Sequence, residues 1–62
     1  MDEYTKGALE ALAWIRLLME KGKSKENIRR EIEEARDLLL KGVAVNFKKR
    51  VEILSETEIQ TL

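Results

Sequence analysis

The 62-residue sequence contains no cysteine and no histidine, and its formal net charge is zero, from 12 basic and 12 acidic residues. Without cysteine no disulfide can form, and without both residue types the common zinc sites are excluded. A zero balance gives no long-range attraction to phosphate backbones or to anionic lipid. No apolar run approaches the ~18 residues of a membrane span, because charged residues interrupt the longest run. These absences exclude a disulfide- or zinc-stabilised fold and indicate that the protein does not span a membrane.

The chain is also short, and it makes one domain at most, residues 1–62. By area scaling, folding removes ~3,800 Å² of apolar surface from water, which contributes about 95 kcal/mol at ~25 cal/mol per Å². Ordering the residues costs about 93 kcal/mol at ~1.5 kcal/mol each. The two terms nearly cancel, so the sequence predicts either unusually regular helices or an oligomer.

Composition gives two expectations about the source and location of the protein. The first residues, Met1-Asp2-Glu3, are acidic, whereas a secretory signal peptide begins with a basic segment. We therefore expect a cytoplasmic protein. A charged fraction of 39% and only three amide side chains are typical of a heat-adapted source.

The most apolar segment spans residues 9–19. On a helix at about 100° per residue, the segment and the turns before it place a core-facing stripe within an arc of roughly 120°. The stripe consists of Tyr4, Ala8, Ala11, Leu12, Ile15, Leu18 and Met19. Trp14 and Leu17 lie off this stripe, so the helix carries apolar side chains on more than one face. Either later helices of the same chain cover Trp14 and Leu17, or a second protein chain does.

The sequence predicts an all-α fold. A long antiparallel helical hairpin, at about residues 3–21 and 25–41, is closed by a short third helix at about 46–54 and a C-terminal helical turn at about 56–62.

The signals for helix ends are glycines and short polar residues. Gly22 and Gly42 follow the two long helices as left-handed caps, and Ser24 and Asn46 are good N-caps for the second and third helices. Gly7, inside the first helix, costs up to ~1 kcal/mol relative to alanine. It indicates either close approach of a neighbouring backbone or fraying of the first turns.

Residues 43–53 are ambiguous between strand and helix. Apolar residues alternate here as in a strand, but Phe47, Val51 and Leu54 are spaced i, i+4 and i+7 as on a helix. The turn of a strand hairpin would fall at residues 48–50, which lack glycine, asparagine and aspartate. We therefore favour a helix. Ser55, with Glu three residues later, matches a capping box and predicts the separate C-terminal turn.

Candidate catalytic groups are scarce. Both serines are better explained as helix caps, and general acid–base or nucleophilic catalysis normally recruits histidine, cysteine or a serine with a base. Several carboxylates are interleaved with arginines, which makes them a poor trap for magnesium or calcium. These carboxylates belong to Glu31, Glu33, Glu34 and Asp37. We expect no enzyme activity, no metal, no cofactor and no small-molecule substrate.

The favoured hypothesis is a non-enzymatic protein–protein interaction module. It would pair with itself as a homodimer, or with a protein partner, through an apolar patch on the first helix that includes Trp14 and Leu17. No membrane partner is expected.

The alternative is a small nucleic-acid-binding protein. No acidic residue lies between positions 38 and 51, and the basic residues of this interval would contact phosphate. They are Lys41, Lys48, Lys49 and Arg50.

Overall fold

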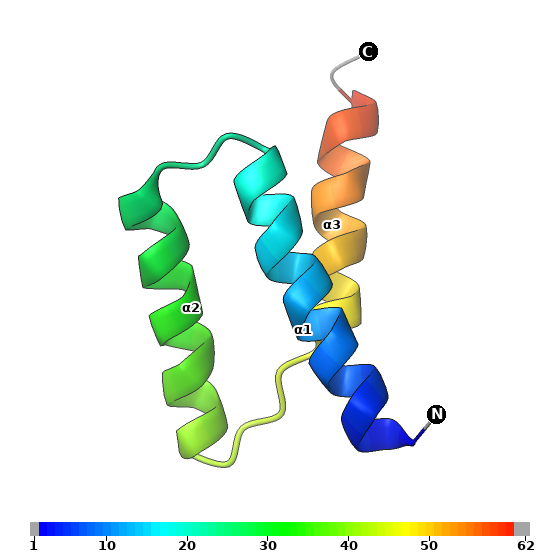
Figure 1. Cartoon of the computed structure of the whole chain (residues 1–62), viewed down its shortest axis with the longest axis vertical. Helices are drawn as coiled ribbons and strands as arrows, with labels where there is room; N and C mark the ends of the chain where they lie inside the picture. The colour runs from blue at the N-terminus through cyan, green and yellow to red at the C-terminus, as the bar shows by residue number, and fades with distance from the viewer. Residues whose placement is uncertain (1, 61–62) are drawn as a thin grey trace.

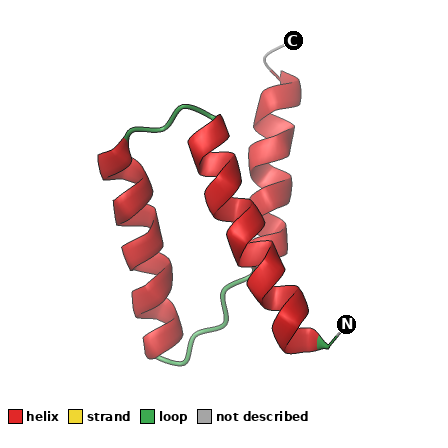
Figure 2. Ribbon diagram, in the orientation of Figure 1, coloured by secondary structure: helices red, strands yellow, loops and turns green. Residues whose placement is uncertain are grey.

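Three helices make up the fold, joined by two short connections. The computed structural model describes the backbone of residues 2–60 and the side chains of residues 2–56. The helices are α1 (Glu3–Glu20), α2 (Lys25–Leu40) and α3 (Phe47–Gln60), and residues 2–60 contain no strand (Figures 1 and 2). The predicted all-α fold is confirmed, and residues 43–46 are an irregular link.

Each helix begins at a side-chain cap. Asp2, Ser24 and Asn46 each accept a hydrogen bond from the backbone N–H three residues later, at 2.7, 3.1 and 2.9 Å. Such a bond satisfies one of the N–H groups that have no partner inside the helix. The N-caps expected at Ser24 and Asn46 are therefore confirmed.

The first two helices end at glycines with positive φ, 74° at Gly22 and 83° at Gly42. The N–H of the residue after each glycine donates to the carbonyl oxygen five residues before it, at 3.4 Å and 2.9 Å respectively. This is the Schellman arrangement, and only glycine adopts its left-handed position without steric cost. Two glycines thus fix both turns of the chain.

α1 lies at the centre of the arrangement. It packs against α3 and, less closely, against α2, whereas the backbones of α2 and α3 do not meet within residues 2–60. α1 and α2 form the predicted antiparallel hairpin, and α3 lies behind α1 in the view of Figure 1. The molecule is thin, with principal extents of 36 × 28 × 15 Å. Over the described residues, the helices therefore form an open arrangement in which α2 has one helical neighbour.

The core lies where the three helices approach one another. Trp14, Leu18 and Ala35 are its buried side chains, with 3%, 1% and 3% of their surface exposed. Partly buried apolar side chains surround them: Ile15, Ile28, Ile32, Phe47, Val51 and Leu54. The last three belong to α3 and share one helical face, as their spacing predicts.

The C-terminal turn predicted as a separate element is wrong over the described residues. α3 continues from Phe47 to Gln60, so Ser55 lies inside it and is not an N-cap. A capping box starts a helix only where the chain has first left one, and no glycine or proline stands between residues 47 and 60 to end α3. Residues 61–62 of the predicted turn lie outside the described residues.

The stripe predicted to face the core on the first helix is wrong in its outer half. Tyr4, Leu12 and Met19 are exposed to 87%, 62% and 64%. The buried residues of α1 are Trp14 and Leu18, which centre the packed face about 80° round the helix from the middle of the predicted stripe. α3 packs on the Trp14 side, because the indole offers the largest apolar area on α1.

Gly7 is an ordinary helical residue without a close neighbour. A Cβ built on it would meet nothing within 4 Å. The close backbone approach considered for this position is therefore wrong.

Candidate functional site

The side chain of Trp14 is buried by residues of its own chain. Its ring centroid lies 5.3 Å from that of Phe47 at an interplanar angle of 44°, and the Arg50 guanidinium carbon lies 5.0 Å from it. Leu17, the second residue of the apolar patch expected to bind a partner, is half-buried. α3 thus covers Trp14, which is the first of the two alternatives drawn from the sequence.

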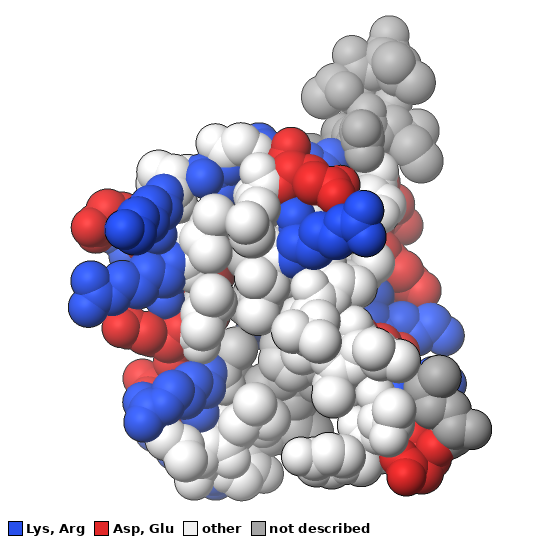
Figure 3. Space-filling model, viewed as in Figure 1, with Lys and Arg blue, Asp and Glu red and all other residues white. Residues whose placement is uncertain are grey.

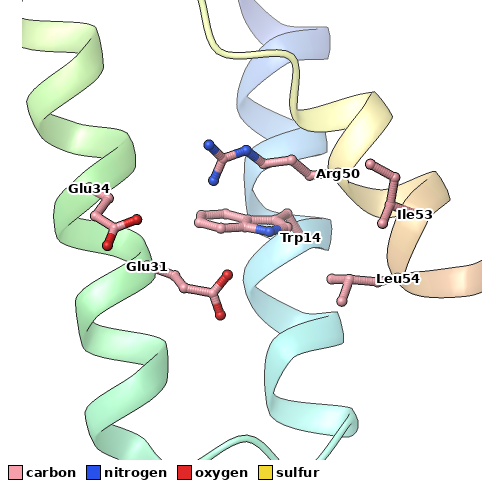
Figure 4. A pocket seen from close by; sticks show the side chains of 6 residues that line it. All are labelled: Trp14, Glu31, Glu34, Arg50, Ile53 and Leu54. Carbon is pink, nitrogen blue, oxygen red and sulfur yellow. The ribbon is translucent and has the colours of Figure 1, made fainter. Parts of the chain in front are cut away.

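A small cleft of about 290 Å³ opens beside Trp14 on the side of α3. Figure 4 shows the carboxylates of Glu31 and Glu34 pointing from α2 into this cleft, opposite Arg50. Ile53 and Leu54 close it on the α3 side. The lining combines two carboxylates with one guanidinium and has no thiol, hydroxyl or imidazole.

The charged groups of the cleft therefore form a polar border beside the buried Trp14. Within the described residues, no three Asp or Glu side chains are grouped to hold a metal ion.

The basic residues proposed for nucleic-acid contact are distributed over three places. Lys41 is the C-cap of α2, and Lys48 and Lys49 are exposed in the first turn of α3. Arg50 is half-buried and lies over the Trp14 ring. The structure therefore groups Lys48 and Lys49 and turns Arg50 toward the core.

A different apolar surface lies between α1 and α2. A hollow of about 710 Å³ and a smaller one of about 160 Å³ both have Ile32 in their linings. We call this surface the α1–α2 groove. Its apolar lining includes Ile15 and Met19 from α1 and Ile28, Ile32 and Leu39 from α2. The smaller hollow is also lined by Ala11 and by the core residues Trp14, Ala35 and Phe47. Figure 3 shows uncharged side chains filling the middle of the face, with charged ones along the edge over α2.

The edge of the α1–α2 groove is predominantly basic. Four cations line it, and the one carboxylate among the lining residues is that of Glu33. The cations belong to Lys23, Lys25, Arg29 and Arg36. The Arg29 Nε lies 3.4 Å from the Glu33 Oε1, and the Arg36 Nη1 lies 4.0 Å from the Asp37 Oδ1. These two cations are partly neutralised, so the excess positive charge of the edge lies mainly on Lys23 and Lys25.

The sequence contained the signal for this groove, although we interpreted it differently. Met19 belongs to the predicted stripe of the first helix, and the spacing of Ile28, Ile32 and Leu39 puts them on one face of the second. The stripe of the first helix is predicted to face the core, but α1 and α2 approach each other too loosely to close over these side chains. Only the packing shows which part of each stripe is left bare.

Within residues 2–60, no helix combines the length and the apolar character needed to cross a membrane. Comparisons with protein-family models, with curated proteins and with solved structures gave no match to this chain.

Proposed function

We propose that this protein is a non-enzymatic interaction module that binds a protein segment, or a second copy of itself, in the α1–α2 groove. The observation that supports this is an apolar lining formed by α1 and α2 in which large side chains remain exposed. Met19 and Leu39, on opposite walls, are 64% and 51% exposed. That it works in the cytoplasm stays a prediction from composition.

The energetics favour a cover over the groove. Fully burying a large aliphatic side chain contributes ~1.5–3 kcal/mol relative to leaving it exposed. Several such side chains stand side by side here, whereas scattered single apolar residues are normal on protein surfaces. A partner that covers the groove therefore gains a contiguous apolar contact, as at the centre of a protein–protein interface.

The proposed surface differs from the patch expected from the sequence. That patch was centred on Trp14 and Leu17, and α3 now covers Trp14. The binding surface remains on helix α1 but moves to the opposite side, next to Met19. The nucleic-acid alternative is disfavoured, because the guanidinium of Arg50 lies over the Trp14 ring instead of facing outward toward a phosphate.

Two adjacent leucines provide the test. Leu39 lines the α1–α2 groove, and Leu40 is 71% exposed outside it. We expect Leu39→Glu to abolish self-association in sedimentation equilibrium, or the binding of leucine-faced helical peptides, at micromolar concentrations. We expect Leu40→Glu to leave either property unchanged. If the wild-type chain stays monomeric and binds no such peptide, or if both variants behave alike, the proposal is wrong.

A further inference from the structure

We infer that the occupant of the α1–α2 groove is an amphipathic helix of another protein, with acidic residues flanking its apolar face. This inference rests on the proposed function and names the partner of the same surface.

The shape of the groove fits a helix. Its two hollows share Ile32, and their apolar α2 residues extend from Ile28 to Leu39, eleven residues along, or about 16 Å at 1.5 Å per residue. Helices α1 and α2 supply the residues on both sides of these hollows. An amphipathic helix laid in such a groove presents anchors at i, i+3, i+4 and i+7. A segment of about 14 residues, some 21 Å long, spans the whole groove.

The charges of the groove select the flanks of that helix. On the α2 helical wheel, Lys25, Arg29 and Arg36 fall within an arc of about 40°, directly outside the apolar side of Ile32. Glu33 offsets part of the charge of Arg29, and Asp37 part of that of Arg36. Together with Lys23, the edge still carries an excess of positive charge. Acidic residues beside the apolar face of the occupant lie opposite this edge, and basic residues at the same places are repelled.

The same edge argues against a second copy of this chain. A two-fold dimer would pair the groove with its own image, because isologous interfaces use the same patch on both subunits. Each copy contributes a groove lined by four cations and one carboxylate. The pairing would bring two positive surfaces together, and like charges at an interface disfavour association.

Two synthetic peptides of two heptads each form the probe. Both carry leucine at the a and d positions and alanine elsewhere, and they differ only at e and g, where one has glutamate and the other lysine. Binding is measured by fluorescence anisotropy of the labelled peptide at low and at high salt. We expect the glutamate peptide to bind at least tenfold more tightly at low salt, and the difference to shrink as salt screens the charges.

Variants locate the contact and its selectivity. The double variant Lys25→Glu, Arg29→Glu should reverse the preference between the two peptides. Met19→Gln should weaken both peptides, and Leu40→Gln should weaken neither. Met19 and Leu40 are both more than 60% exposed, so these substitutions leave the core intact. Circular dichroism of each variant verifies that the helices are retained.

The outcomes separate this inference from the proposed function. Equal binding of the two peptides, or binding unaffected by the double charge reversal, overturns the acidic helix but keeps the groove as a binding surface. Self-association that Leu39→Glu abolishes, and that excludes both peptides, assigns the groove to a second copy and overturns the inference as well. If laurate, an apolar chain with an anionic head, displaces the glutamate peptide at equimolar concentration, the occupant is a small amphiphile. Binding of neither peptide, together with a monomeric chain, overturns both proposals.

Discussion

Leu18 and Leu12 carry the same side chain on the same helix, and truncating them to alanine should have very different effects. Leu18 is 1% exposed and belongs to the core, whereas Leu12 is 62% exposed. The sequence pattern places both on one core-facing stripe and so predicts similar costs. The structure predicts that only Leu18→Ala destabilises the protein severely.

The magnitudes follow from burial. Leucine exceeds alanine by about three carbons, worth ~2.4 kcal/mol when fully buried at ~0.8 kcal/mol each. Leu18→Ala loses all of this and also leaves a cavity, so we expect a cost of about 3–4 kcal/mol. Leu12 is buried by little more than a third, which gives a cost of roughly 0.9 kcal/mol. The higher helix propensity of alanine and the absence of a cavity at the surface reduce that cost further.

Urea unfolding followed by circular dichroism and by the fluorescence of Trp14 measures both free energies. A 62-residue domain has a total stability of roughly 3–9 kcal/mol, so Leu18→Ala should remove a large part of it and lower the Tm by about 12–32 °C. Leu12→Ala should lower the Tm by only a few degrees. Equal costs for the two variants would show that Leu12 is buried in solution and would refute the face assignment of α1.

Three other outcomes are expected from the described contacts. Gly7→Ala should raise the free energy of unfolding by up to ~1 kcal/mol, because the position is helical and open. Gly42→Ala should lower it by about 1 kcal/mol, because alanine is strained at a φ of 83°. Thermal melts that rank the two variants in the other order would contradict this. Arg50→Gln should cost about 0.5–1 kcal/mol through its lost contact with the indole ring, whereas the exposed Lys49→Gln should cost almost nothing in the same urea titration. The backbone N–H of the third residue after Asp2 donates to its carboxylate and holds the pKa of Asp2 below its ordinary value of 3.8. The stability from this cap is present above that value and is lost as the pH falls below it. Asparagine caps a helix without titrating, so the plot of Tm against pH should be flatter in acid for Asp2→Asn than for the wild type. Parallel curves for the two proteins would argue against it.

The helices themselves were readable from local signals. Ser24 and Asn46 cap the helices that follow them, and Gly22 and Gly42 take the positive φ expected of helix-ending glycines. Each of these features involves residues within five positions of each other, so the sequence holds all the information they need. Where a local signal was overruled, as at Ser55, the reason was equally local: nothing nearby ends the helix.

The candidate site was not readable in the same way. The sequence shows that α1 is apolar over too much of its circumference for one neighbour, but it does not say which neighbour takes which side. That choice depends on contacts between distant segments, above all the packing of Phe47 and Arg50 on Trp14. The cations of α2 form part of a candidate site only because the tertiary structure places an apolar groove beside them.

The sequence by itself determined where the three helices start and where the two glycine turns lie, because caps and periodicity act between residues close in the chain. The tertiary structure decided the rest. α3 covers Trp14 and leaves Met19 bare, and α2 stands far enough from α1 for a groove to open between them. α1 has more apolar faces than it has neighbouring helices to cover them. Which face is buried therefore depends on contacts with distant segments of the chain and not on the residues of the helix itself.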